Sequence, residues 1–137
     1  MQGFKLVTPT NVEIKFELYL EAAPITCAAF LEILPFTKTF YHARVSGQEI
    51  WIDNMSPLNI IQENASVFTE VGEVVLGPSL PFRSKTKNCF GIYYGDGKGF
   101  DACNIFAKVV NEDKEKLFEL GNSIWENGHL QLTISKL

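Results

Sequence analysis

Alternation of apolar and polar side chains is the feature that most constrains the fold of this chain. Between residues 12 and 19 every second residue is apolar, namely Val12, Ile14, Phe16 and Leu18. Side chains of a β-strand point to opposite faces with a period of two, so this pattern predicts a half-buried strand. The residues before it, Thr8 to Asn11, are typical of a hairpin turn.

Further β-rich runs follow, separated by turn-forming residues. They are Thr39–Val45, Gln48–Ile52, Val74–Leu76, Cys89–Tyr94, Ile105–Val110 and the alternating residues Leu130, Leu132 and Ile134. Ser46 and Gly47 predict a tight turn between the first two runs, and Gly95–Gly99 predicts a hairpin loop. Regularly spaced short strands of this kind favour a closed antiparallel β-barrel.

Two segments have helical patterns. Pro24 suits the first position of a helix, and apolar residues then recur with helical spacing up to Leu34, where Pro35 predicts the end. A second helix is predicted from Lys114 to Leu120, with Asp113 as its cap and Gly121 at its end. The expected fold is therefore mainly β, a closed antiparallel barrel with two covering helices.

Length, charge and cysteine usage narrow the class of protein. The chain has 137 residues and a net charge of −4, which fits one domain over residues 1–137 and provides no basic surface for nucleic acid. No run approaches the ~20 apolar residues that span a bilayer, and the start does not resemble a signal peptide. We therefore expect a cytoplasmic protein without a membrane partner. Its cysteines, Cys27, Cys89 and Cys103, are expected to be buried thiols.

Several segments together resemble cyclophilins. The segment Lys15–Leu34, KFELYLEAAPITCAAFLEIL, is similar to the first strand and helix of that family, and FGIYYG and NIFAKVV resemble two later strands. The resemblance implies a cyclophilin-like barrel and places Arg44 and Gly47 at positions of the active strand. The rest of the active-site motif departs from the family. Trp51–Asp53 replaces the Gln-Gly-Gly segment, Gly91 replaces a Phe, and the pocket His position falls near Cys103.

A narrower resemblance covers the motif around Arg44. His42, Ala43, Arg44, Ser46, Gly47 and Glu49, followed by Asn104, Phe106 and Ala107, are similar to the pattern of a branch of small bacterial and archaeal cyclophilin-like proteins of unknown function. We assign the chain to that branch. The branch implies no established reaction.

The candidate site follows from the predicted strands. His42 and Arg44 share a face if their strand reaches Val45, and Glu49 and Trp51 share a face across the turn. Arg44 would bind a carboxylate through its planar fork, Trp51 would stack on the ligand, and Glu49 would take an amine. The alternative is a structural ion pair between Arg44 and Glu49 with an exposed His42. Tyr93 and Tyr94 point to opposite faces, so only one of them can line the cleft.

These residues predict a protein that binds a small carboxylate-bearing metabolite or peptide end near Arg44. One alternative is a peptidyl-prolyl isomerase with a remodelled, weak or inactive site, because the proline pocket is missing from the motif. Another is a subunit of a small-molecule amidohydrolase-type enzyme, since cyclophilin-like domains occur in subunits such as those of 5-oxoprolinase. Enzymatic activity stays open, including a His42 general base, and a homo-oligomer is compatible with the sequence.

No cofactor or metal site is predicted. His42 and His129 are far apart in the sequence, and neither has a Cys or carboxylate at ligand spacing. The segment Phe82–Lys87 is locally basic and is interpreted as a solvated loop that could reach an anionic ligand.

Overall fold

The computed structural model describes residues 1–81 and 85–137. Within these residues the chain forms a mainly β structure with two α-helices. The strands are β1 Gly3–Val7, β2 Glu13–Leu18, β3 Phe36–His42, β4 Gly47–Ile52, β5 Ala65–Phe68, β6 Glu73–Leu76, β7 Phe90–Val109 and β8 His129–Lys136. The helices are α1 Pro24–Glu32 and α2 Lys114–Asn127, and a 3₁₀ turn, Asn111–Asp113, precedes α2. The mainly β prediction with one early and one late helix is confirmed.

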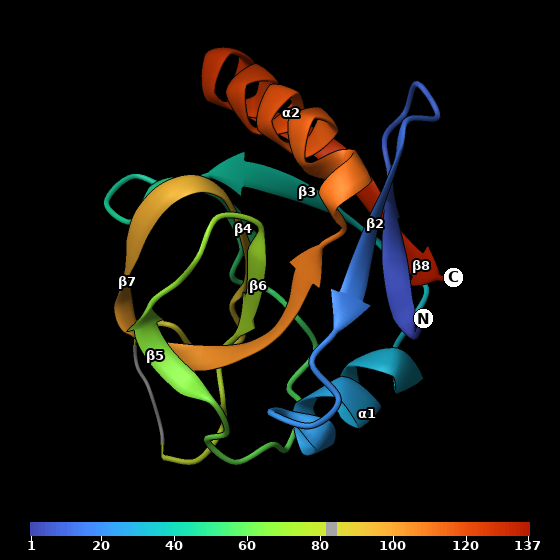
Figure 1. Ribbon diagram of the computed structural model, residues 1–137. Helices are drawn as coiled ribbons and strands as arrows, with labels where there is room; N and C mark the ends of the chain where they lie inside the picture. Colours follow the sequence, from blue (N-terminus) through green and yellow to red (C-terminus); the bar gives the residue numbers. More distant parts are fainter. Residues whose placement is uncertain (82–84) are drawn as a thin grey trace.

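All named strand pairs are antiparallel, in the order β2-β1-β8-β3-β4-β7-β5, and β2 also pairs with β7. The long strand β7 curves around one side of the molecule, while α1 and α2 lie at opposite ends (Figure 1). Strand β6 pairs with both arms of β7, so that Val75 lies opposite Gly91 on one arm and Ile105 on the other. One strand therefore supplies residues to several parts of the sheet.

The apolar residues of the alternating runs form the main core. Ile14, Phe16 and Leu18 are buried as the pattern predicts, whereas Val12 precedes β2 and is exposed. Aromatic rings fill the centre of this core, and the closest pairs involve Phe4, Phe16, Phe30, Phe90 and Phe106. Burial of aromatic side chains contributes strongly to stability because each removes a large apolar area from water.

The helix boundaries differ from the prediction at their ends. Helix α1 ends at Glu32, two residues before the predicted Leu34, in a turn where Leu34 N–H donates to the carbonyl of Leu31. Helix α2 runs past Gly121 to Asn127, because Gly121 packs flat on the ring of Tyr94 and does not interrupt the helix. Gly128, with a φ of +94°, ends α2 instead.

Two strand predictions were also wrong in extent. Strand β3 ends at His42 and not at Val45, so residues 43–46 form a wider turn before β4 begins at Gly47. The predicted hairpin loop Gly95–Gly99 lies inside β7, where Gly97 pairs with Gly47 and Lys98 with Phe68. Both differences matter because the turn after β3 and the middle of β7 border the same cavity.

Among the described residues, no helix is both long and apolar enough to span a membrane.

Candidate functional site

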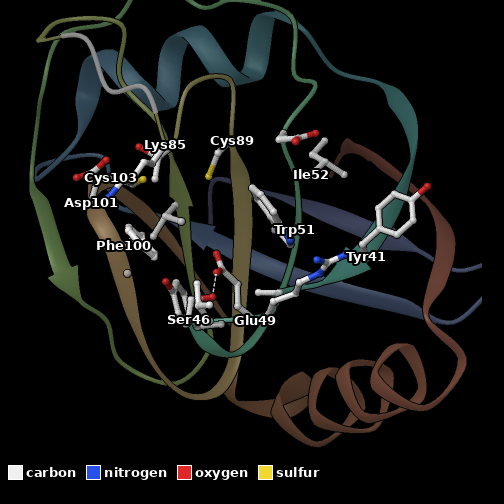
Figure 2. A pocket seen from close by; sticks show the side chains of 18 of the residues that line it. Tyr41, Ser46, Glu49, Trp51, Ile52, Lys85, Cys89, Phe100, Asp101 and Cys103 are labelled. Atoms are coloured by element: carbon white, nitrogen blue, oxygen red, sulfur yellow. Dashed lines mark hydrogen bonds between the residues drawn. The ribbon is translucent and has the colours of Figure 1, made fainter.

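A cavity of about 900 Å³ opens between the β3–β4 turn, strand β4 and strand β7 (Figure 2). Its volume lies within the range of small-molecule sites. One wall is a second apolar cluster, separate from the main core, formed by Val75, Cys89, Tyr93, Cys103 and Ile105 with Trp51 packed against it. The cavity therefore combines an apolar wall with the polar groups of the turn.

All four predicted site residues border this cavity. In the β3–β4 pair, Tyr41 lies opposite Trp51 and His42 lies opposite Ile50, which is buried in the main core. Directly paired residues share a face, so the His42 side chain lies on the core face and the Trp51 side chain on the cavity face. The sequence left open whether the face of His42 is also the face of Trp51, and in the structure the two faces differ.

The His42 ring is held by its neighbours. Its Nδ1 lies 2.8 Å from the carbonyl oxygen of Ala43, and its Nε2 lies 2.8 Å from the hydroxyl of Tyr94. The Trp125 ring of α2 packs edge-on against it, with centroids 4.7 Å apart. A carbonyl can only accept, so Nδ1 carries the hydrogen and Nε2 accepts from Tyr94 in the neutral ring. Neither nitrogen remains for a ligand.

Arg44 lies in the turn between β3 and β4, is exposed, and borders the cavity. Within residues 1–81 and 85–137, it forms no ion pair with Glu49. The alternative interpretation of a structural Arg44–Glu49 pair therefore has no support in the structure.

Glu49 is the buried acid of the cavity, with only 5% of its surface exposed. The Ser46 hydroxyl donates to its Oε1 at 2.5 Å (Figure 2). The Tyr93 hydroxyl also hydrogen-bonds to the carboxyl group. Burial raises the pKa of Glu49 from its ordinary 4.5 to about 7, although both hydrogen bonds act to lower it. A carboxyl group with this pKa changes charge near neutral pH.

A glycine of strand β7 leaves the space in which the buried Glu49 carboxyl group lies. Gly91 lies opposite Trp51 in the β4–β7 pair, and a β-carbon at Gly91 would overlap with Oε2 of Glu49. The absence of a side chain at this position leaves the space that the carboxylate fills. Gly91 is also the position where the cyclophilin motif carries a Phe, so this departure was the sequence signal for a rebuilt site.

The two adjacent tyrosines have different roles. Tyr93 belongs to the cavity wall, and burial is the main cause that raises its pKa well above the ordinary value. Tyr94 belongs to the main core, where its ring contacts Gly121 and Phe118 of α2. Tyr93 is therefore the tyrosine that lines the cleft.

Sequence reasoning missed two thiols and two hydroxyls of the cavity lining. Cys89 and Cys103 are buried there and hydrogen-bond to each other; this bond, followed by burial, raises the pKa of Cys89. Thr69 and Thr86 also border the cavity, and in the described part of the chain their buried hydroxyls are the only buried side-chain N or O atoms without a hydrogen-bond partner. Only the folded arrangement brings these residues together.

The far rim carries charged groups from the segment before β7 and from β7 itself. Phe100, Asp101 and Lys85 lie across the cavity from Trp51 (Figure 2), and the Lys85 ammonium lies 4.3 Å from the centroid of the Phe100 ring. The predicted basic loop also includes residues 82–84, which lie outside the described residues. No group of three or more His, Cys, Asp or Glu residues suitable for a metal is found in the described ranges.

A family model described as "Protein of unknown function (DUF3830)" matches residues 7–136. Among curated proteins, none matches the sequence significantly. Similar solved structures share the fold at low identity. McbB in complex with tryptophan has a TM-score of 0.78 and 17% identity over 96% of this chain, which corresponds to only 44% of the McbB chain.

The hypothetical protein AF2241 from Archaeoglobus fulgidus has a TM-score of 0.66 and 18% identity, covering 99% of this chain and 95% of its own. A cyclophilin-type peptidyl-prolyl cis-trans isomerase from Cryptosporidium parvum, in the presence of the dipeptide Ala-Pro, has a TM-score of 0.60 and 16% identity, covering 99% of both chains. The cyclophilin-like fold predicted from the sequence is thereby confirmed.

Proposed function

The chain belongs to the DUF3830 family of proteins of unknown function, and from this premise we propose that it binds a small carboxylate-bearing metabolite or peptide end in the cavity beside Arg44. The observation that carries the proposal is the position of Arg44, which is exposed in the β3–β4 turn and borders a cavity of about 900 Å³. A cavity of this volume can hold a small molecule, and a guanidinium group at its border can donate two hydrogen bonds to a carboxylate.

The predicted site residues have distinct tasks in this proposal. Arg44 binds the carboxylate through its planar guanidinium group, which can donate two parallel hydrogen bonds. Trp51 provides the aromatic wall, and Glu49 provides the polar floor. His42 has no direct task in this proposal, because both of its ring nitrogens are bonded, to the Ala43 carbonyl and the Tyr94 hydroxyl.

The McbB structure supports the class of ligand. Its bound tryptophan is a small molecule with a carboxylate and a flat ring, and the present cavity has an arginine and an aromatic wall for the same two features. The likeness at 17% identity extends to the fold alone, and this chain spans less than half of McbB. Tryptophan therefore serves as a first probe for the cavity.

A closed barrel is part of the proposal, since a closed sheet would hold the cavity walls in fixed positions. It is supported by the β2–β7 pairing, which connects the two ends of the path β2-β1-β8-β3-β4-β7.

Two enzymatic alternatives have a specific observation each. The whole-chain likeness to a cyclophilin-type isomerase favours a remodelled prolyl isomerase, but Glu49 occupies the space over Gly91. The buried acid Glu49 favours a subunit of an amidohydrolase-type enzyme, for which it would be the general base. Ser46, whose hydroxyl donates to Glu49, would be the nucleophile of such an enzyme, but it is only 8% exposed, so we place binding ahead of turnover.

A thermal-shift screen of carboxylate-bearing metabolites tests the proposal. A ligand that binds only the native state stabilises it by RT ln(1 + [L]/Kd), about 2.7 kcal/mol at a hundredfold excess over Kd. The panel includes L-tryptophan, indole-3-propionate and Ala-Pro, each paired with its amide or decarboxylated analogue. We expect stabilisation only by carboxylates, and less of it in Arg44→Lys. Equal stabilisation by the analogues without a carboxylate would contradict the proposal.

A further inference from the structure

We propose, on the basis of the proposed function, that the ligand is a zwitterion whose cationic nitrogen binds to Glu49 at the floor of the cavity. The ligand itself would then supply the charge that neutralises this carboxylate. The inference adds a second charged subsite to the carboxylate subsite at Arg44 and restricts the ligand to amino-acid-like molecules.

The first argument is the burial of an acid without a cation. Glu49 is 5% exposed, and the groups that bond to it, the hydroxyls of Ser46 and Tyr93, are neutral. An ionised carboxylate taken out of water without an opposite charge is costly. In the part of the chain that the structure describes, no Lys, Arg or His forms an ion pair with it. The open side of the acid borders the cavity, where a cation can reach it.

The second argument is that the Glu49 carboxylate has unoccupied hydrogen-bond acceptor positions. An ionised carboxyl group offers about four acceptor positions. Ser46 and Tyr93 occupy two of them, while Oε2 itself fills the space that a β-carbon at Gly91 would take. An ammonium group has three donors and fits such a partly occupied acceptor.

The surrounding charges leave Glu49 as the acid best placed for an ammonium group. From β7 it faces Tyr93, and from the segment before β7 it faces Cys89; the pKa of each is raised above its ordinary value, so both are neutral near pH 7. The charged groups are at the rim: Arg44 on the turn, Asp53 after β4, Lys85 before β7 and Asp101 on β7. His42, on β3, points to the core face and bonds to Tyr94. A zwitterion with its nitrogen inward and its carboxylate at Arg44 matches this distribution.

Proton release follows from this arrangement. Without ligand, the raised pKa keeps Glu49 largely protonated below pH 7. A bound cation favours the ionised form, so the proton leaves the carboxyl group for the solvent. The affinity for an amine should therefore rise with pH up to about 7, by at most tenfold per pH unit, and then level off.

Three matched probes test the inference by isothermal titration calorimetry: L-tryptophan, indole-3-propionate without the amine, and tryptamine without the carboxylate. We expect L-tryptophan to bind ten- to a hundredfold more tightly than indole-3-propionate, and Glu49→Gln to abolish only that difference. Titrations at pH 6 in buffers of different ionisation enthalpy should show nearly one proton released for L-tryptophan and none for indole-3-propionate. Equal affinity of these two probes, or an unchanged preference in Glu49→Gln, would overturn the inference.

The outcomes separate the two proposals. If indole-3-propionate binds and Arg44→Lys weakens it, while the amine adds nothing, only the zwitterion inference fails. If tryptamine binds and the carboxylate adds nothing, the proposed function fails instead. If none of the three probes binds, the proposed function and the zwitterion inference both fail for indole ligands. A measurement on the ligand-free protein then tests the titration of Glu49.

That measurement is a carbon-13 NMR titration of the Glu49 carboxyl group in the ligand-free protein. We expect a midpoint near 7, which Ser46→Ala should raise further because it removes a donor to the ionised form. A midpoint at the ordinary 4.5 would overturn the proton-linked inference.

Discussion

The carboxyl group of Glu49 lies over the backbone of Gly91 on the neighbouring strand, in space that a β-carbon would occupy. An acid and a glycine on paired strands thus form the floor of the cavity together.

Gly91→Ala should therefore displace the Glu49 side chain. Overpacking of a buried site costs about 1–3 kcal/mol, and the moved carboxyl group should also weaken binding of L-tryptophan. Chemical denaturation and calorimetry measure the two effects. Gly95→Ala is the matched control, because its β-carbon meets the side chain of Gln48 outside the cavity lining. Wild-type affinity in Gly91→Ala would show that the floor is not part of the site.

The stability of the ligand-free protein should fall between pH 4.5 and 7. Over this range Glu49 ionises in the unfolded state but stays protonated in the folded state, so rising pH favours unfolding. The loss is complete above the folded pKa and amounts to about 3 kcal/mol at most, at roughly 1.4 kcal/mol per pH unit. Urea denaturation across this range should show the fall in wild type but not in Glu49→Gln. Parallel pH profiles of the two proteins would contradict the raised pKa.

Arg44→Lys should weaken binding of carboxylate probes although the charge is kept. A lysine cannot reproduce the planar fork, and loss of a hydrogen bond to a charged group costs about 1.5–3 kcal/mol. Trp51→Ala should also lower the affinity, by removing the aromatic wall. Lys98, which does not border the cavity and lies near the ring of Phe68, provides the control Lys98→Ala. Calorimetry should show weaker binding in Arg44→Lys and Trp51→Ala and unchanged binding in Lys98→Ala. Equal affinities of all three variants would show that the ligand binds at another site.

His42→Ala should reduce stability but change ligand affinity little. The ring bonds to Ala43 and Tyr94 and packs on Trp125, so its loss should cost about 1–3 kcal/mol. Denaturation and calorimetry measure the two quantities separately. A tenfold or greater loss of affinity with little change in stability would contradict this prediction and would indicate that His42 contacts the ligand directly.

Little or no prolyl isomerase activity is expected on a proline peptide. The uncatalysed barrier is about 20 kcal/mol, and catalysis needs a pocket that grips the proline ring. Here Glu49 fills the space over Gly91, where the cyclophilin motif has a Phe. A protease-coupled peptide assay, with an active cyclophilin as the positive control, measures the rate. Turnover comparable to that control would disprove the expectation.

The sequence predicted the fold where the pattern is local and repeated. Period-two alternation was sufficient for β2 and for the end of β8, because each strand buries one face. It could not predict that β7 continues through Gly95 and Gly97, since those glycines read as a loop until strand β4 is placed against them. The length of α2 was missed for a similar reason, because Gly121 is accommodated by the distant Tyr94 ring.

The sequence predicted which residues border the candidate site but not how their side chains are oriented. Arg44 and Glu49 were identified from one motif and Trp51 from the alternation of the next strand, and all three border one cavity. The pairing of His42 with the buried Ile50 was not visible in the sequence, and it decides which way the imidazole points. Thr69 and Thr86 were missed because neither belongs to a motif, and only tertiary packing leaves their hydroxyls unpartnered.

The contact between Gly121 and Tyr94 has a consequence for the opposite face of the sheet. Tyr93 and Tyr94 are neighbours in β7, so a shift of that strand by one residue would exchange their faces. The Tyr94 ring packs against α2 at Gly121, where a β-carbon would overlap with it. This contact therefore favours the register of β7 in which Tyr94 faces α2 and Tyr93 faces the cavity. A larger residue at position 121 would displace Tyr94 and, through the backbone of β7, its neighbour Tyr93 in the cavity wall. Ligand binding should therefore constrain a residue of α2, although this residue does not border the cavity.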